Sequence, residues 1–437
     1  MPLGTDIVKI SRMERVISPQ IPKKIFTENE TTYINTKNNK AQTSAGIFAA
    51  KEAVLKAFGT GITLPLNEVE ILYTESGAPY LSLLGKAKAY SDNNGFTHWE
   101  ISISHDGEYA VAVAMACADK LAGAHIKIAK KLKDAPQNAI TRDIAKNLLS
   151  PRKSSTHKGD YGRLYVLAGS IGLTGAAIMA CTSALKCGAG LISLGCAKEL
   201  NNIFEISLKE VMTKPLQSKD GLIVKDDLEK IIANAKNADV CLIGPGLGRS
   251  EDLTYIVKTL ITSNMTTPLV IDADGLNAIS EEVAMLQNHK MPITITPHIG
   301  EFARLTGLSA EEILKDTQKH ALEFAKKHNV TVVLKSHQTV VASPGGEVYI
   351  NILGNPGMAT GGTGDVLAGA VASFGAQGKP ALEAALLGVY IHSYAADLGA
   401  YTLGEYSLTP SDITDNLAFA IKNTVEEMQT LCVHGQK

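Results

Sequence analysis

The sequence predicts two folded domains of different class: an α+β domain at residues 1–118 and an α/β domain at residues 135–437, joined by a linker at 119–134. Three observations lead to this prediction. The chain has 437 residues, about three times the ~150 residues of a typical domain. Strand and helix patterns are mixed in the first part, whereas apolar strands alternate with helices in the second. The segment between them is polar and rich in lysine, as is typical of a domain boundary.

The composition is that of a soluble globular protein without a strong charge bias. Hydrophobic residues make up 45% of the chain, and 42 basic side chains face 44 acidic ones. This balance argues against a partner that is a nucleic acid or an anionic membrane. The six cysteines form no C-x-x-C pair, and the N-terminus has no basic segment followed by an apolar one. We therefore expect a cytoplasmic protein with buried thiols.

In the first domain, the pattern predicts a strand, a helix and a hairpin. The strand covers Gly4–Ile10 and the helix covers Ser44–Phe58. The hairpin joins Ile101–His105 to Tyr109–Met115 through an Asp106-Gly107 turn, because Asp-Gly between alternating apolar segments is a strong hairpin signal.

In the second domain, the pattern predicts a mainly parallel sheet covered by helices. Continuous Val, Ile and Leu runs that alternate with helices are typical of strands buried on both faces. Five such runs are expected to be strands: Leu164–Ala168, Val240–Ile243, Leu269–Ile271, Ile293–Ile295 and Val332–Leu334.

Glycine and polar residues follow each of these five strands. They are Gly169-Ser170, Gly244–Gly248, Asp272–Asp274, Thr296–His298 and Lys335. An ordinary turn between a strand and a helix would explain any one of them. The carboxyl ends of parallel strands share one edge of the sheet, where ligands bind in open α/β folds. The five segments together therefore predict one cleft, although His298 alone reads as a loop histidine and Lys335 alone as a solvated charge.

The glycine-rich segment Gly354–Asp365 predicts an anion-binding site. It holds five glycines between residues 354 and 364 and leads into an apolar helix at Val366–Ala372. Glycines let backbone amides approach a ligand, and a helix N-terminus attracts negative charge. The segment fits neither the P-loop pattern nor G-x-G-x-x-G. A flexible linker is the alternative, which the helix that follows at once disfavours.

Asp365, at the end of this segment, allows two interpretations. Asp is a preferred helix N-cap, and capping alone would explain it. A carboxylate beside an anion site would repel the anion, however, unless it had a task such as accepting a proton from a hydroxyl. We favour the general base.

In the first domain, Asp6 and Glu52 are candidate ligands of Mg²⁺. Asp6 lies in an otherwise apolar strand, and Glu52 lies in a helix that is apolar almost all round. Carboxylates in such surroundings are costly unless they are paired, and Mg²⁺ takes one or two carboxylates together with phosphates and water. An ion pair between Glu52 and Lys56 is the alternative, and the spacing leaves both open. His105 on spacing alone only precedes the hairpin turn.

The second domain resembles the bacterial NAD(P)H-hydrate dehydratase family of the ribokinase-like superfamily, over about residues 135–425. The motifs that carry the resemblance are His157–Gly162, Thr174–Ala176, Gly244–Gly248, Thr296–Glu301, Lys335–Thr339 and Gly354–Asp365. The resemblance implies repair of reduced nicotinamide cofactor: ADP, or ATP in its place, drives removal of water from the hydrate of NADH or NADPH.

This resemblance also implies the roles of individual residues. Asp365 would be catalytic, and Ala176, Gly248, His298 and Asp365 would contact the hydrate. The adenine nucleotide would be bound by Lys335, Ser336, His337, Gln338, Thr339 and Gly364. A ribokinase-like kinase for a small alcohol is the alternative function of this domain.

The first domain resembles holo-acyl-carrier-protein synthase, a 4′-phosphopantetheinyl transferase, over about residues 1–117. The matching motifs are Gly4–Val8, Phe26–Glu30, Phe48–Ala53, Gly59–Gly61 and Ser102–His105. The resemblance implies that Asp6 and Glu52 hold Mg²⁺ on coenzyme A and that Lys51 and His105 serve the coenzyme A side. The partner would be an acyl carrier protein, whose serine takes the phosphopantetheine, and the protein would form homo-oligomers.

Two positions depart from the pattern of the transferase family. The chain has Lys9 where a Glu is usual and Ile47 where an Arg is usual. An inactive first domain that serves oligomerisation is therefore the alternative to a bifunctional enzyme.

Overall fold

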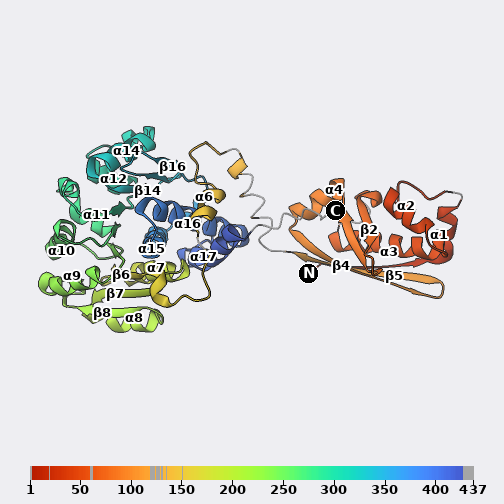
Figure 1. The fold of residues 1–437 in the computed structure, drawn as a ribbon, viewed down its shortest axis with the longest axis horizontal. Helices are drawn as coiled ribbons and strands as arrows, with labels where there is room; N and C mark the ends of the chain where they lie inside the picture. The colour runs from red at the N-terminus through yellow and green to blue at the C-terminus, as the bar shows by residue number, and fades with distance from the viewer. Residues whose placement is uncertain are drawn as a thin grey trace. The chain divides into compact units, whose positions relative to one another are not determined.

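The computed structural model describes residues 2–426 except 19, 60–62, 119–123, 125–127, 129–130, 134 and 150. The chain divides into two compact units between residues 127 and 128 (Figure 1). Most of the predicted linker, the last two residues of the Gly59–Gly61 motif and Cys432 lie outside the described residues. The bounds of the linker therefore stay a prediction.

The N-terminal unit is built on a three-stranded antiparallel sheet in the order β1-β5-β4. Its strands are β1 (Leu3–Lys9), β4 (Phe96–Asp106) and β5 (Tyr109–Ala118), and a second hairpin pairs β2 (Val69–Tyr73) with β3 (Pro79–Leu83). The predicted hairpin is confirmed. Its turn is Gly107-Glu108 rather than Asp106-Gly107, because Asp106 pairs with Tyr109 and Gly107 takes the left-handed φ of 55°. The α+β class is confirmed.

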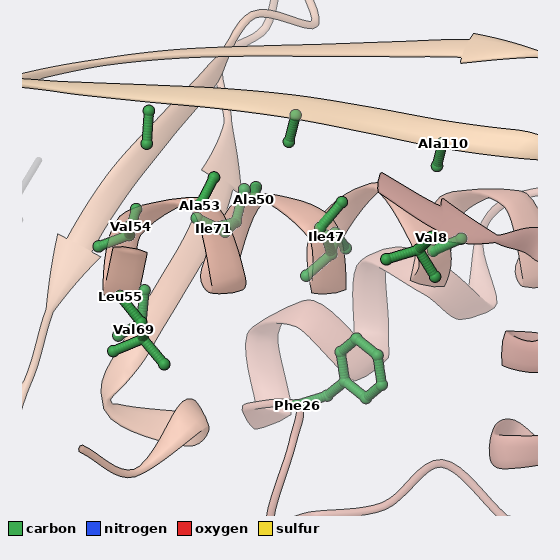
Figure 2. Packing of buried hydrophobic residues seen from close by; sticks show 14 of the residues in the cluster. Val8, Phe26, Ile47, Ala50, Ala53, Val54, Leu55, Val69, Ile71 and Ala110 are labelled. Carbon is green, nitrogen blue, oxygen red and sulfur yellow. The ribbon is translucent and has the colours of Figure 1, made fainter. Parts of the chain in front are cut away.

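The α-helices among the described residues of this unit are α1 (Ile10–Ile17), α2 (Glu28–Asn35), α3 (Lys40–Phe58) and α4 (Gly85–Asn93). Helix α3 begins four residues before the predicted start, because the Asn39 side chain caps it by accepting from the Gln42 amide. Figure 2 shows Ile47, Ala50 and Ala53 of α3 beside the strand that carries Ala110.

Helix α3 lies very close to β1. A Cβ on Gly4 would stand 1.9 Å from the carbonyl oxygen of Ala53, so only glycine allows this approach. The close packing of α3 on β1 places Asp6 of β1 next to α3, which carries Glu52.

The C-terminal unit contains a nine-stranded sheet in the order β16-β15-β14-β13-β12-β11-β6-β7-β8. Neighbours from β8 to β14 are parallel, and β15 and β16 are antiparallel. The strands are β6 (Arg163–Leu167), β7 (Leu191–Ala197), β8 (Met212–Leu216), β11 (Val240–Ile243), β12 (Leu269–Ile271), β13 (Ile293–Ile295), β14 (Thr331–Leu334), β15 (Val340–Ala342) and β16 (Val348–Ile350). All five predicted strands are present.

Helices cover both faces of this sheet, as predicted. The helices described in this unit are α6 (Arg142–Leu148), α7 (Thr174–Lys186), α8 (Asn201–Ser207), α9 (Leu228–Lys236), α10 (Glu251–Thr262), α11 (Asp274–Ile279), α12 (Ile299–Thr306), α13 (Ala310–Lys315), α14 (Thr317–His328), α15 (Thr363–Ala376), α16 (Ala381–Leu403) and α17 (Pro410–Val425). Every residue of β11, β12, β13 and β14 is buried, as strands covered on both faces require. Helix α15 packs on β6, β11 and β12, and α16 packs on β13, β14 and β15 (Figure 1).

The direction of the chain through the sheet changes between β6 and β11. From β6 the sheet grows outward through β7 and β8 on one side and through β11 to β14 on the other. Ligands of open α/β folds bind outside the carboxyl ends of the strands at such a switch point. We therefore expect a ligand site at the loops that follow β6, β11 and the neighbouring strands.

Four cysteines of the described residues are buried. Cys181, Cys187, Cys196 and Cys241 are buried free thiols, as predicted. Among the described residues, we find no helix with the length and apolar character needed to span a bilayer.

Candidate active sites

The loops that follow the parallel strands converge, as predicted. The Ser170 hydroxyl after β6 donates to the carbonyl oxygen of Gly246 after β11, at 2.8 Å. The Thr296 hydroxyl after β13 donates to Oδ1 of Asp272 after β12, at 2.7 Å. Lys335 after β14 reaches the same Asp272 oxygen, also at 2.7 Å. Five segments distant in sequence thus form one edge.

Asp365 does not cap its helix. The N-cap of α15 is Gly362, with the left-handed φ of 101°, and no side chain caps the helix. Asp365 instead lies in the first turn, where burial and then repulsion from Asp272 raise its pKa to about 7, although the Lys335 charge acts in the opposite direction. The capping interpretation is therefore wrong. A carboxyl group with a pKa near neutrality is suited to accept a proton at physiological pH.

Lys335 lies at the centre of the charged groups. Its ammonium is 2.7 Å from Asp272 and 4.0 Å from Glu301. Burial lowers its pKa, but the negative charges of Asp272 and Glu301 outweigh burial and hold the pKa above the usual value. A Cβ on Gly364 would lie 3.1 Å from Nζ. A permanent positive charge therefore sits against the first turn of α15, whose amides already favour anions.

His298 begins α12 and lies beside Lys335. Its Nδ1 accepts from the amides of Gly300 (2.9 Å) and Glu301 (3.3 Å), and Glu301 in return accepts from the His298 amide. His298 and Lys335 form a parallel β-bridge. Because Nδ1 is an acceptor, the neutral ring carries its proton on Nε2, and the side chain is 55% exposed. The loop interpretation therefore holds for Nδ1, and Nε2 lies 3.5 Å from Oε1 of Glu301.

Ala176 and Gly248 lie at the same edge. The Gly248 amide donates to Oδ2 of Asp274 at 2.9 Å. A Cβ on Gly246 would lie 2.8 Å from the Ala176 Cβ, and one on Gly362 would lie 2.5 Å from Met179 of the same helix, α7. Helix α7, which carries Ala176, therefore touches both the loop after β11 and the start of α15. That loop carries Gly248, and the first turn of α15 carries Asp365.

The residues predicted to bind the nucleotide follow β14 as a short loop. The Ser336 hydroxyl donates to the carbonyl oxygen of Gln338 at 2.8 Å. His337 and Gln338 are exposed, and Ser336 and Thr339 are half-buried. The loop begins at Lys335, which contacts Gly364. The structure thus brings Lys335, Ser336–Thr339 and Gly364 to the same edge as Asp365.

Asp397 of α16 is a site residue that sequence reasoning missed. Its buried carboxylate accepts from the Gly354 amide (3.1 Å), from the Asn355 amide side chain (3.0 Å) and from Lys131 (3.0 Å). It thereby anchors the start of the glycine-rich segment. A signal was present, because Asp397 is the one acid of α16 beyond its first turn and follows a long apolar stretch, a pattern close to the one that singled out Asp6.

The turn after β12 is strained where it supplies carboxylates to the site. Ala273 has φ 48° and ψ −117°, which is unfavourable for a residue with a Cβ. The conformation lets Asp272 reach Lys335 and Asp274 reach Gly248. The sequence analysis placed this turn in the predicted cleft but gave its residues no individual role.

In the N-terminal unit, Asp6 and Glu52 lie close enough to repel each other, and nearby cations compensate their charge only in part. Lys56 is 2.9 Å from Asp6, so Lys56 pairs with Asp6 and the expected alternative of a Glu52–Lys56 pair is wrong. Burial and then repulsion from Asp6 raise the pKa of Glu52. Two carboxylates that repel each other fit a divalent cation. In the described residues no set of three or more metal-binding side chains occurs.

The predicted role of Lys51 on the coenzyme A side is wrong. Its side chain is 0% exposed and its ammonium lies 2.8 Å from Oε2 of the equally buried Glu30. The same ammonium donates to the carbonyl oxygens of Leu66 (2.9 Å) and Val69 (2.6 Å). Because an ammonium has three N–H donors, none remains for a ligand. Lys51 instead links α3 to Glu30 and to the backbone before and within β2, inside the core.

His105 is exposed at the end of β4 and contacts α3. Its Nε2 is 3.2 Å from the carbonyl oxygen of Gln42, and a Cβ on Gly46 would lie 2.7 Å from the ring. Glu52 is six residues beyond Gly46, or ~9 Å along the helix. Within one chain the structure does not bring His105 to Asp6 and Glu52, and its role stays a prediction.

Comparisons with known proteins assign both parts of the chain. Residues 164–418 match the family model of NAD(P)H-hydrate dehydratase, and residues 2–114 match that of the 4′-phosphopantetheinyl transferase superfamily. The chain therefore belongs to the NAD(P)H-hydrate dehydratase family and carries a domain of the transferase superfamily. Both are families of enzymes, and both predicted resemblances are confirmed.

Similar proteins include bifunctional NAD(P)H-hydrate repair enzymes. The one from Thermofilum pendens is 34% identical over 387 residues, which are 86% of this chain and 73% of that protein. The one from Moorella thermoacetica is 38% identical over 68% of this chain and 56% of its own length. The chain thus spans between half and three quarters of these relatives. The ADP-dependent (S)-NAD(P)H-hydrate dehydratase of Lactococcus lactis is 36% identical over 65% of this chain and 98% of its own.

Solved structures confirm the ribokinase-like fold. The ADP/ATP-dependent NAD(P)H-hydrate dehydratase of Bacillus subtilis, co-crystallised with ATP/Mg²⁺, is 28% identical with a TM-score of 0.56 and covers 66% of this chain and 100% of its own. A ribokinase-like superfamily protein from Enterococcus faecalis is 31% identical with a TM-score of 0.58 and covers 66% of this chain and 98% of its own.

Because the fold raises the pKa of Asp365, ionisation of this group destabilises the C-terminal unit as pH rises from about 4 through about 7. We expect Asp365→Asn to be more stable than the natural protein, and the difference in free energy of unfolding to grow by roughly 1–3 kcal/mol between about pH 5 and about pH 8. Urea unfolding followed by circular dichroism measures this. A difference that does not change with pH would contradict the assigned environment.

Proposed function

We propose that the C-terminal unit removes water from the (6S)-hydrate of NADH or NADPH at the expense of ADP, with ATP as a second nucleotide. The observation that carries the proposal is the position of Asp365, a carboxyl with a pKa near neutrality beside Lys335 and the N-terminus of α15. Relatives from Neisseria meningitidis and L. lactis are named as ADP-dependent (S)-NAD(P)H-hydrate dehydratases, which supports this choice of substrate.

The proposed reaction begins at the C6 hydroxyl of the hydrate. Asp365 accepts the hydroxyl proton while the oxygen attacks the terminal phosphorus of ADP, and the bond from that phosphorus to the bridging oxygen breaks to release AMP. Hydroxide is a poor leaving group and phosphate is a good one. The C6–O bond then breaks, phosphate departs with the bonding electrons, and loss of a proton from C5 restores the ring double bond.

The other side chains bind and orient the two substrates in this proposal. Lys335 and the amide of Gly364 meet the nucleotide phosphates, where a cation and a helix N-terminus act together. Ser336, His337, Gln338 and Thr339 form the exposed loop that contacts the rest of the nucleotide. Ala176, Gly248 and His298 contact the hydrate together with Asp365.

Replacement of Asp365 by Asn tests whether its carboxyl group acts as a general base or has only a structural role. We expect Asp365→Asn to lower kcat by about 10²- to 10⁴-fold, because the amide keeps the shape and cannot accept the proton. The rate of the natural enzyme should fall as pH drops below about 7, since protonation of Asp365 removes the base. Incubation with hydrated NADH and ADP, followed at the absorbance of NADH, measures both effects.

The exposed Asp415 of α17 provides a matched control, because Asp415→Asn changes the charge away from the site. A fully active Asp365→Asn variant would rule out the base. Consumption of nucleotide without recovery of NADH absorbance would instead favour the alternative of a small-alcohol kinase.

We propose that the N-terminal unit transfers 4′-phosphopantetheine from coenzyme A to a serine of an acyl carrier protein. Asp6 and Glu52 would hold Mg²⁺ against the pyrophosphate of coenzyme A, and the cation would neutralise the charge of the departing adenosine 3′,5′-bisphosphate. The mutual repulsion of the two carboxylates supports this, as does the match to the transferase superfamily. The nucleophile then belongs to the partner, so this unit needs no catalytic serine.

Calorimetric titration of coenzyme A in the presence of Mg²⁺ tests this site. We expect Asp6→Asn and Glu52→Gln each to weaken binding at least ~10-fold, or ~1.4 kcal/mol, because each removes a metal ligand. The exposed Glu14 of α1 is the control, as Glu14→Gln keeps both ligands. Failure of the natural protein to bind coenzyme A would favour the alternative of an inactive domain that serves oligomerisation.

We also propose that the protein assembles into homo-oligomers through one face of the β1-β5-β4 sheet. Leu3 and Ile7 of β1 are each 61% exposed, and Tyr109, Val111 and Val113 of the neighbouring β5 are 36–42% exposed. Alternate residues share a face of a sheet, so these side chains form one apolar surface. Such surfaces mark interaction sites in soluble proteins.

A charge on this face should prevent assembly. We expect Ile7→Lys combined with Val113→Lys to lower the molar mass measured by light scattering at ~10 µM protein, because buried ammonium groups are costly in an interface. Tyr80→Lys, on the exposed surface of β3, is the control and should leave the mass unchanged. A natural protein that is monomeric at this concentration would contradict the proposal.

A further inference from the structure

Arg304 of α12 is a cation held at the edge of the dehydratase site without a carboxylate partner. Its Nε donates to Oδ1 of Asn277 at 3.1 Å, and the side chain is exposed. No carboxylate lies within 4.0 Å of the guanidinium among the residues that the structure describes. Only one of the five N–H donors of an arginine takes part in this bond. The terminal nitrogens are therefore available to a ligand.

Arg304 is connected to the hydrate side by a chain of hydrogen bonds. Asn277, which accepts from Arg304, donates to Oδ1 of Asp274 at 3.3 Å. The other oxygen of Asp274 accepts from the amide of Gly248 at 2.9 Å. The orientation of the guanidinium is thus tied to the loop proposed to contact the hydrate.

The guanidinium also lies near His298. A Cβ on Gly300 would stand 2.9 Å from Cε1 of His298 and 4.0 Å from Nη1 of Arg304. Both side chains therefore flank the same turn of α12. Arg304 is therefore linked to Gly248 through Asn277 and Asp274 and lies near His298, and both of these residues are predicted hydrate contacts.

The charges of the site explain why a cation is needed here. Asp272, Asp274, Glu301 and Asp365 gather at this edge, and Lys335 is engaged with Asp272 and with the first turn of α15. The hydrated dinucleotide brings a pyrophosphate with two negative charges, which these carboxylates would repel. A planar guanidinium matches the geometry of phosphate oxygens.

We propose that Arg304 binds a phosphate group of the hydrated dinucleotide and so helps to select this substrate. This inference rests on the proposed dehydratase function and extends it to recognition of the substrate's phosphates. The phosphate is either the pyrophosphate, which NADH and NADPH hydrates share, or the additional 2′-phosphate of the NADPH hydrate.

The test compares Arg304→Gln, Arg304→Lys and a matched control, Arg249→Gln. Arg249 directly follows Gly248 and is exposed, but no hydrogen bond or ion pair within the described part of the chain orients it. We expect Arg304→Gln to raise KM for the hydrate about 10-fold with kcat and KM for ADP nearly unchanged. Arg304→Lys should keep part of the affinity, and Arg249→Gln should change KM less than threefold.

Two further measurements identify the contact as electrostatic and locate it. The dependence of kcat/KM on salt should be weaker in Arg304→Gln, because one phosphate contact is lost, and a purely structural defect would not change this slope. An equal loss with both hydrates assigns the pyrophosphate, and a loss with NADPH hydrate alone assigns the 2′-phosphate.

Unchanged KM values for both hydrates, or a rise in KM for ADP alone, would overturn the proposal. So would an effect of Arg249→Gln as large as that of Arg304→Gln. An inactive natural protein would contradict the proposed function separately. In that case calorimetric titration of hydrated NADH into the natural protein and into Arg304→Gln, without nucleotide, still measures the contact, and equal binding to both proteins overturns it.

Discussion

The ion pair between Lys335 and Asp272 is the interaction on which the dehydratase site depends. The two groups are 2.7 Å apart, and around them stand Glu301 and Asp365, whose charges would otherwise repel each other. Lys335 limits the rise in the pKa of Asp365 that burial and Asp272 produce. Lys335 thereby keeps the pKa of Asp365 close to neutrality. It also leaves a positive charge against the N-terminus of α15.

The register of the parallel sheet places this ion pair. Asp272 follows β12 directly, and Lys335 follows β14, with β13 between them. The bridge between His298 and Lys335 extends the same register beyond the strand ends. A shift of one residue in β14 would turn Lys335 away from Asp272, because successive side chains of a strand point to opposite faces. The register of the sheet therefore decides whether Lys335 and Asp272 can pair.

The N-terminal unit uses buried charge in two different ways. Lys51 and Glu30 form a pair that is fully enclosed, with the remaining N–H donors of Lys51 bound to backbone carbonyls. Asp6 and Glu52 instead leave negative charge without full compensation, since Lys56 is mostly exposed and pairs with Asp6 alone. A charge whose partners are all within the fold is not free for a ligand, whereas one with incomplete compensation is. The contrast separates the structural lysine from the candidate metal site within one helix, α3.

The sequence by itself determined five of the nine strands of the large sheet, the hairpin of β4 and β5, and the edge at which the site forms. Side-chain periodicity and the position of polar residues after apolar runs depend only on local order along the chain. The sequence also singled out Asp365 and the glycine-rich segment. Tertiary structure alone decided that Asp365 does not cap α15, that Lys51 is enclosed, that Lys56 pairs with Asp6, and that Asp397 anchors Gly354. Each of these depends on a partner distant in sequence, and on burial that a one-dimensional pattern does not contain.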